Sequence, residues 1–193
     1  MVKRCFVAIE LPPRLTRQLV EMQDQLRALP RNVARRLRPV HAEALHVTVK
    51  FLGATEDHQV SPLIETLART AALRGPLTLA LSGLGAFPNQ ERPHTIFAAL
   101  SQGKDDLVRL MQDIDVACAP LGFMMEERPR VPHLTLARVE GARPRGALGD
   151  WIAQHRQTDF GKLEARELVL FESVLRPEGS LYLPLARLPF AAS

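Results

Sequence analysis

Two short segments with the same pattern, His-x-Thr inside an alternating apolar run, constrain this 193-residue chain more than any other feature of its sequence. The first contains His46 and Thr48, and the second contains His133 and Thr135. Because side chains alternate faces along a strand, each His shares one face with the Thr two residues later, while the aliphatic residues between and after them face a core. Two such strands would offer two imidazoles, one as general base and one as general acid.

Strict alternation also places the residues that follow each motif. Lys50 shares the face of His46 and is a candidate phosphate contact, whereas Phe51 points into the core. Arg138 falls on the face opposite the second motif histidine. It reaches that face only if the strand ends or bulges near Ala137.

The order of elements around the two motifs is repeated in the chain. Each half, about 1–90 and about 91–193, reads strand, helix, His-x-Thr strand, helix, strand. The first motif histidine follows Phe6 by 40 positions, and the second follows Phe97 by 36. We therefore predict an internal duplication within a single bilobal domain over 1–193, with two lobes related by a pseudo-twofold axis so that the motif strands face each other across a cleft.

Periodicity and turn residues predict the individual elements. Thr55 is the predicted N-cap of the helix that follows the first motif. Residues 83–89 are rich in glycine and are predicted as a turn, and residues 123–125 as a short strand. A further turn is predicted at 176–179 and a basic loop at 141–145. The other strands are predicted over 4–9, 77–81, 95–100, 163–174 and 181–188, and the helices over 13–29, the stretch after 55, 105–119 and 147–156.

Composition indicates a globular protein that works in the cytoplasm. The hydrophobic share is 46% and the charged share 24%, and no apolar run approaches the length of a membrane span. An acidic residue and two prolines follow the first strand too soon for a signal peptide. The two cysteines, Cys5 and Cys118, have no metal-type spacing and are predicted to be reduced and buried. We expect a monomer that does not bind membranes.

The net charge of +4 is carried mostly by arginine, whose planar fork suits phosphate. This favours an anionic partner such as RNA, although an arginine excess is explained equally well by genome composition. A basic connector, residues 31–39, leads directly into the first motif and could steer a phosphate towards it, or be a solvated loop.

The residues on the motif strands favour phosphate-ester chemistry without a metal or another cofactor. Neither strand carries a carboxylate on the histidine face, as a metal site of this kind would, and no serine stands in a nucleophile-elbow motif. A neutral imidazole can take a proton from water while a protonated one gives a proton to the leaving oxygen. Thr48 and Thr135 can donate hydrogen bonds to the phosphate, and Arg138 can neutralise developing charge.

At these residues the chain resembles the two-histidine phosphoesterase superfamily, and within it the bacterial RNA 2′,3′-cyclic phosphodiesterases, also called the 2′-5′ RNA ligase-like family. The two motifs carry the resemblance, together with segments 4–12, 83–88 and 121–123, and the likeness runs over nearly the whole chain. The resemblance implies an α+β, bilobal fold with antiparallel sheets, helices outside and the site between the lobes. It also implies hydrolysis of an RNA terminal 2′,3′-cyclic phosphate to a 2′-phosphate.

In the implied reaction His46 protonates the departing 3′ oxygen and His133 activates water, although the pseudosymmetry leaves the two roles interchangeable. The chain departs from the family at Leu37, where a Trp is common, and at Arg130, where an aromatic residue is common. Both positions suit contact with a nucleobase, and Arg130 could instead stack on a base or hold a phosphate. Alternatives are a non-catalytic RNA- or nucleotide-binding module, 2′-5′ RNA ligation in the same cleft, and hydrolysis of a small cyclic nucleotide.

Overall fold

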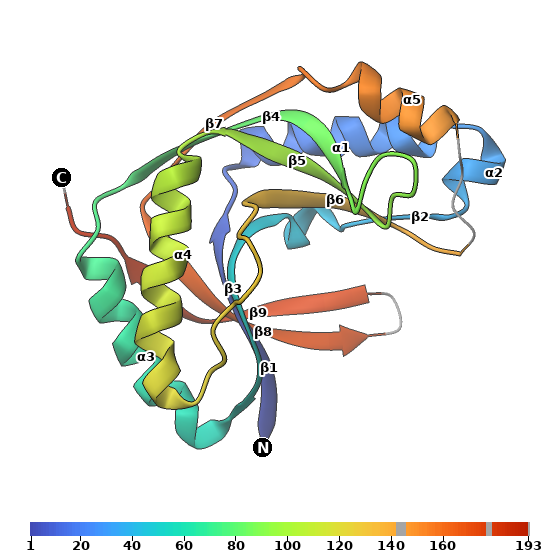
Figure 1. The fold of residues 1–193 in the computed structure, drawn as a ribbon. Helices are drawn as coiled ribbons and strands as arrows, with labels where there is room; N and C mark the ends of the chain where they lie inside the picture. The colour runs from blue at the N-terminus through green and yellow to red at the C-terminus, as the bar shows by residue number, and fades with distance from the viewer. Residues whose placement is uncertain (142–145, 177–178, 193) are drawn as a thin grey trace.

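The structure, a computed structural model, describes residues 1–141, 146–176 and 179–192. The two motif strands lie in two different antiparallel sheets (Figure 1). One hydrophobic core contains side chains from both sheets. Helices pack on the sheets, so the arrangement confirms the predicted α+β fold class with two antiparallel sheets.

The first sheet has the strand order β3-β1-β8-β9 and contains the first motif in β3. β1 lies between β3 and β8, so it is an interior strand of this sheet. Val7 and Ile9 enter the main core, whereas Phe6 and Ala8 form a separate apolar cluster on the opposite face. The strands of this sheet are β1 (Val2–Glu10), β3 (His46–Glu56), β8 (Glu167–Arg176) and β9 (Gly179–Pro189).

The second sheet has the strand order β2-β6-β5-β4-β7 and contains the second motif in β6. β6 is an interior strand, paired with β2 on one side and β5 on the other. Each sheet draws on both halves of the chain, because β2 and β4 join the second sheet and β8 and β9 join the first. The strands of the second sheet are β2 (Leu37–Pro39), β4 (Leu77–Phe87), β5 (Thr95–Gln102), β6 (His133–Val139) and β7 (Asp159–Ala165).

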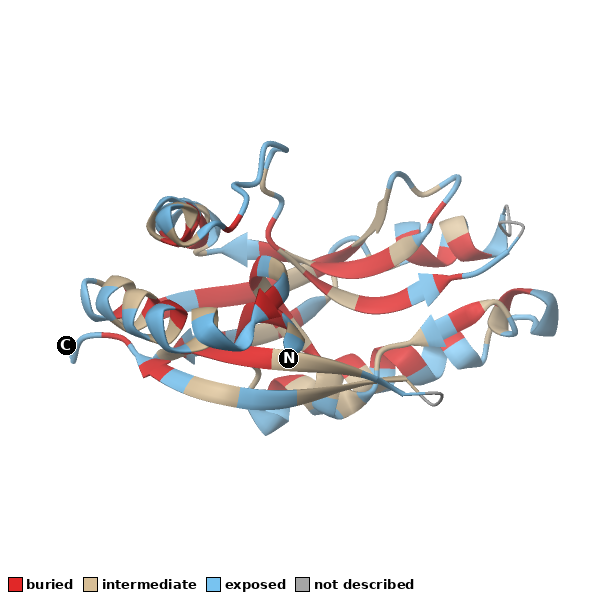
Figure 2. Cartoon of the chain, turned by 90° about the horizontal axis from the view of Figure 1, so that it is seen from below, coloured by how far each residue is buried: buried red, intermediate tan, exposed pale blue. Residues whose placement is uncertain are grey.

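The helices cover the apolar faces of the sheets. α3 and α4 pack against each other and against strands β8, β9 and β3, while α1 lies along β7, β2 and β6 and α5 contacts β4. The core therefore lies between the helices and the aliphatic side of each motif strand, and Figure 2 shows the buried residues gathered along the sheets and the helix faces turned towards them. The helices are α1 (Pro13–Arg27), α2 (Arg31–Ala34), α3 (Asp57–Ala72), α4 (Lys104–Cys118) and α5 (Ala147–Gln154), with short 3-10 helices at Ala42–Ala44 (η1) and Ala119–Leu121 (η2).

The start of α3 differs from the prediction. β3 continues to Glu56, and Thr55 is buried within that strand, so it does not cap the helix. Glu56 is the N-cap, and its side chain accepts a hydrogen bond from the backbone N–H of Gln59. The Gln59 side chain accepts the Glu56 N–H in return at 2.9 Å. This reciprocal capping box satisfies two of the N–H groups that a helix start leaves unpaired.

The predicted turn at 83–89 is wrong, because β4 runs to Phe87. Gly83 has a φ of +79° and lies where the pairing of β4 with β5 is interrupted, and the strand resumes at Leu84. The glycines that suggested a turn therefore allow an irregular strand to continue.

The closing part of the chain also differs. The predicted strand 163–174 is two strands, β7 and β8, which lie in different sheets. Residues 123–125 form no strand, although Phe123 is buried in the core. Part of the predicted turn at 176–179 and most of the basic loop at 141–145 lie outside the described residues. Cys5 and Cys118 are free and buried, as predicted.

Candidate functional site

A β-bulge in the first motif strand changes which side chains share the face of His46. The pairing of β3 with β1 passes over Val49, so the strand has one extra residue at that point. The alternation of faces therefore shifts by one after the bulge. Lys50 turns into the interior and is 6% exposed, whereas Phe51 turns outward and is 73% exposed. The predictions that Lys50 shares the histidine face and that Phe51 enters the core are both wrong.

A bulge at the equivalent position of the second motif strand brings Arg138 to the histidine face. The pairing of β6 with β5 passes over Leu136, since Ala137 pairs with Ile96 and the next pair joins Thr135 to its partner on β5. Leu136 and Ala137 are both fully buried, and Arg138 is exposed. This is the bulge that Arg138 requires to lie beside the second motif.

The two motif strands are therefore built alike, with His, Thr, a bulge, and an outward side chain three residues after the Thr. That last position holds Phe51 in the first strand and Arg138 in the second. Arg138 pairs across the sheet with Arg38 of β2, whose guanidinium lies 2.8 Å from the Glu140 carboxylate. No described side chain forms an ion pair with Arg138, so its positive charge is not balanced by the part of the protein that the structure describes.

Both motif imidazoles are held by the same kind of hydrogen bond. His46 Nδ1 donates to the backbone carbonyl of Ala44 at 2.7 Å, and His133 Nδ1 donates to that of Val131 at 2.7 Å. A proton fixed on Nδ1 leaves the lone pair of the neutral ring on Nε2. His46 Nε2 lies 3.0 Å from the hydroxyl of Thr48. Each histidine is therefore oriented with Nε2 as the nitrogen available for proton transfer.

Aromatic rings pack against each imidazole. The His46 ring lies 4.9 Å from that of Phe6 and 5.3 Å from that of Tyr182, measured between centroids. The His133 ring lies 4.9 Å from Phe87 and 5.3 Å from Phe97. Phe6 and Phe97 are the residues whose spacing to the motifs indicated a repeat, and each lies on the strand next to its histidine.

Gly85 provides the room that Phe97 needs. The two residues pair directly across β4 and β5, and a Cβ added to Gly85 would lie 2.4 Å from the Phe97 ring. Any side chain at this position would push the ring that packs against His133. Gly85 is thus a structural requirement of the second motif.

Burial lowers the pKa of both motif histidines, because an apolar environment disfavours the imidazolium form. The hydrogen bond to a backbone carbonyl opposes this effect at each ring. The charge of His133 lowers the pKa of His46 further. The strands that carry the two imidazoles, β3 and β6, lie against each other in the fold (Figure 1).

Lys50 and Arg130 meet at a buried carboxylate. Lys50 Nζ forms an ion pair with Asp115 Oδ1, and Arg130 forms one with Asp115 Oδ2. Lys50 also donates to the carbonyl of Met124 at 2.8 Å. Burial alone would raise the pKa of Asp115, but the hydrogen bonds from Lys50 and Arg130 outweigh it and hold that pKa below its ordinary value. The carboxylate is therefore ionised and bridges the two cations.

This bridge connects the two motifs. Lys50 is two residues after Thr48, and Arg130 is three residues before His133. Asp115 itself lies on α4, so one buried side chain contacts β3 just after the first motif and the segment that leads into the second motif strand. Lys50 and Arg130 each already have a protein partner, so a positioning role suits them better than direct contact with a substrate. Leu37, the other position considered for contact with a nucleobase, is only 4% exposed and lies in the core.

Sequence reasoning missed Asp115, although a signal for it exists. Asp115 follows Met111 by four residues and precedes Cys118 by three, so it lies on the apolar stripe of α4. A carboxylate in such a stripe needs a buried cationic partner. Tyr182 and Phe87 were also missed, because nothing in their local sequence connects them to the motifs.

Within the part of the chain that the structure describes, His, Cys, Asp and Glu side chains do not gather in a group of three or more that could hold a metal ion. The helices in the same part are too short or too polar to cross a membrane.

Comparison with known families gives a match over most of the chain. A family model described as "LigT like Phosphoesterase" matches residues 9–97 and 99–182. A Methanocaldococcus jannaschii protein named RNA 2′,3′-cyclic phosphodiesterase is 31% identical over 179 residues, which cover 93% of this chain and 96% of that protein. A Methanothermobacter thermautotrophicus protein of the same name is 30% identical and covers 94% of this chain and 96% of its own length.

Solved structures have the same fold. A crystal structure of a Thermus thermophilus protein superimposes with a TM-score of 0.82 at 27% identity, covering 98% of both chains. The structure of E. coli LigT complexed with 3′-AMP gives a TM-score of 0.78 at 24% identity and covers 98% of this chain and 99% of that one. At that identity the second comparison supports the fold alone.

Proposed function

This chain belongs to the LigT-like phosphoesterase family, and we propose on that premise that it hydrolyses the 2′,3′-cyclic phosphate at the end of an RNA to a 2′-phosphomonoester. The names of its relatives support the reaction, because proteins 31% and 30% identical to it over more than nine-tenths of their length are named RNA 2′,3′-cyclic phosphodiesterase. The observation that carries the proposal is the matched pair of imidazoles, each with Nδ1 bound to a backbone carbonyl and each two residues before a threonine on its strand.

The proposed reaction is an in-line displacement at phosphorus. Nε2 of neutral His133 takes a proton from water as the water oxygen forms a bond to phosphorus. The bond from phosphorus to the 3′ oxygen breaks, and Nε2 of protonated His46 gives its proton to that oxygen. Each histidine ends in the protonation state in which the other began, so one proton exchange with solvent restores the enzyme.

The remaining site residues hold the phosphate in this scheme. Thr48 and Thr135 donate hydrogen bonds to the non-bridging oxygens, and Arg138 balances the charge that grows on them in the transition state. Arg138 suits this role because no described carboxylate neutralises it. The scheme needs no metal ion, since the histidines move both protons and the arginine supplies the positive charge.

The test is hydrolysis of a short RNA that ends in a 2′,3′-cyclic phosphate, in excess EDTA, with the product identified by chromatography against authentic 2′-phosphate and 3′-phosphate standards. We expect a 2′-phosphate, formed at an unchanged rate in EDTA and lost in both His46→Ala and His133→Ala. Turnover only after a divalent metal is added back would overturn the metal-independent mechanism. Tight, stoichiometric RNA binding without any turnover would instead indicate a binding module.

A further inference from the structure

The positive charge of this chain is concentrated in one segment that ends shortly before the first motif. Residues 25–42 contain five arginines and no Asp or Glu. The whole chain has 25 Lys and Arg against 21 Asp and Glu, so the remainder has 20 against 21 and carries no net positive charge. An arginine excess caused by genome composition would be spread along the chain, so this concentration needs a local explanation.

Strand pairing joins this segment to the face of β6 that carries the second motif. Arg38 of β2 lies directly opposite Arg138, and opposite residues of an antiparallel pair share one face of the sheet. Two like charges in this arrangement repel each other. Among the described residues, the carboxylate that pairs with either of them is that of Glu140, 2.8 Å from the Arg38 guanidinium. A bound anion beside the two guanidiniums would offset the remaining repulsion.

Two further arginines extend this line away from the second motif. Arg38 Nη1 donates a hydrogen bond to the backbone carbonyl of Arg35 at 2.9 Å, which places Arg35 next to the Arg38 guanidinium. Arg31 lies one helical turn before Arg35, since the Arg35 N–H donates to the Arg31 carbonyl at 3.2 Å. Both side chains are exposed, and in the described part of the chain neither forms an ion pair. The arginine row is therefore made of Arg138, Arg38, Arg35 and Arg31.

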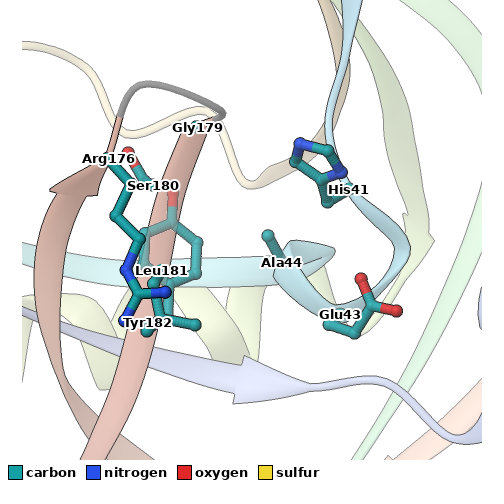
Figure 3. A pocket seen from close by; sticks show the side chains of 8 residues that line it. All are labelled: His41, Glu43, Ala44, Arg176, Gly179, Ser180, Leu181 and Tyr182. Carbon is teal, nitrogen blue, oxygen red and sulfur yellow. The ribbon is translucent and has the colours of Figure 1, made fainter.

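The surface beside the first motif has a different charge pattern. A pocket of about 330 Å³ lies there, with Glu43 on one side and Arg176 on the other (Figure 3). Its lining combines a carboxylate with a guanidinium, so it attracts a polyanion less than the arginine row does. Of these two surfaces, the arginine row is the better match for a chain of negative charges.

We propose that the arginine row binds the backbone phosphates of the RNA strand upstream of its 2′,3′-cyclic end. The proposal rests on the proposed function, in which Arg138 holds the reacting phosphate. Every nucleotide before the last one adds a negatively charged phosphate to the substrate. Guanidinium groups bind phosphate oxygens through paired hydrogen bonds, and such contacts do not read the base sequence. The row therefore favours RNA ends of any sequence over small cyclic nucleotides.

The experiment compares two substrates that differ in their upstream phosphates. They are adenosine 2′,3′-cyclic phosphate and a short oligoadenylate with the same cyclic end, and kcat/KM is measured for both over a range of salt concentrations. The variant is Arg31→Gln, Arg35→Gln, which breaks no ion pair among the described residues. The control is Arg69→Gln, Arg109→Gln, which removes the same charge from exposed positions on α3 and α4, away from α2 (Figure 1).

We expect the wild-type protein and the control to prefer the oligoadenylate, and this preference falls as salt rises because binding releases counterions from the RNA. Each phosphate contact on a single strand contributes about 0.7 to the slope of log kcat/KM against log salt, so the variant should lose about 1.4 of that slope. Its kcat/KM for the mononucleotide should be unchanged. No preference in the wild-type protein, or equal slopes in the variant and the control, overturns the proposal. An equal loss on the mononucleotide also overturns it, because that substrate has no upstream phosphate.

Binding of the reaction product separates this proposal from the proposed function. The probe is an oligoadenylate that ends in a 2′-phosphate, and its affinity is measured by fluorescence anisotropy. Binding that weakens in the variant and not in the control, without hydrolysis of either substrate, supports the arginine row and refutes the phosphodiesterase activity. Hydrolysis of both substrates with equal kcat/KM supports the activity and refutes the role of the row.

Discussion

Replacing Asp115 with Leu tests whether one buried carboxylate connects the two motifs. The Asp115 and Lys50 side chains are 3% and 4% exposed, so the variant leaves the Lys50 ammonium buried without its counter-ion. Arg130 is less affected, because it is 17% exposed and can turn towards solvent.

The burial of this pair sets the expected magnitude. Removing one partner of a buried ion pair costs about 3–5 kcal/mol. Typical domains are stable by about 5–15 kcal/mol, so Asp115→Leu loses a large share of the free energy of unfolding. For a chain of this size, about 1 kcal/mol corresponds to a Tm change of about 2–4 °C, and the expected decrease is therefore about 6–20 °C.

The double variant Lys50→Met, Asp115→Leu keeps the prediction testable if the single variant folds poorly. It replaces the pair with apolar side chains of similar size, and we expect it to recover at least half of the lost stability. Urea unfolding of the wild type and both variants gives the comparison. Asp113→Leu is the control, because Asp113 lies on the same helix but is 48% exposed. A cost below about 1 kcal/mol for Asp115→Leu, or a cost equal to that of the control, would refute this account.

Three further predictions concern the motif histidines and their surroundings. Burial lowers the pKa of both imidazoles, so above the ordinary His pKa of about 6.5 both rings are neutral and the general acid is lost. We therefore expect kcat/KM to peak on the acidic side of that value, as a pH–rate profile will show. In His133→Ala the pKa of His46 should rise, because the second positive charge is gone, and NMR titration of the imidazole measures this shift. In Gly85→Ala the displaced Phe97 ring should move His133 and lower kcat about tenfold or more with a smaller change in KM, as steady-state kinetics will show.

Controls and contrary outcomes for these predictions are available in the same chain. Gly75→Ala is the control for the glycine variant, because a Cβ at Gly75 meets no atom within 4 Å. Equal kinetics for the two alanine variants would contradict the role of Gly85. A pH optimum well above about 7 would mean that burial does not lower the two pKa values in the free enzyme. A His46 pKa unchanged in His133→Ala would mean that the rings are too far apart to act on one phosphate.

The sequence predicted the two motif strands, the helices and the α+β class because these depend on local periodicity. The pattern of apolar residues determines which face of each element is buried, and no long-range information is needed for it. The internal duplication within a single bilobal domain stays a prediction. The two motif strands do share one local feature, a bulge after the threonine.

The faces of Lys50, Phe51 and Arg138 could not be predicted because a bulge leaves no clear local signal. One extra residue reverses the alternation, so every later side chain changes face. The equivalent bulges moved Lys50 into the interior and brought Arg138 to the site. Only the pairing with the neighbouring strands, β1 and β5, reveals either change.

Contacts between distant segments account for the other misses. Asp115 and Tyr182 lie 65 and 136 positions from the first-motif residues that they touch, Lys50 and His46. Local sequence gives no distance between such pairs, so their partners emerge only from the fold. The split of 163–174 into two strands has a similar cause, because the apolar pattern continues while the chain passes from one sheet to the other.

The most direct test of the central claim separates the general acid from the general base. A 2′,3′-cyclic phosphate with sulfur in place of the 3′ oxygen has a leaving group that departs without protonation, so it needs no general acid. The account predicts that His46→Ala hydrolyses this substrate at close to the wild-type rate, while His133→Ala remains inactive. Rescue of His133→Ala instead would reverse the two roles, and failure to rescue either variant would contradict acid–base catalysis by this pair.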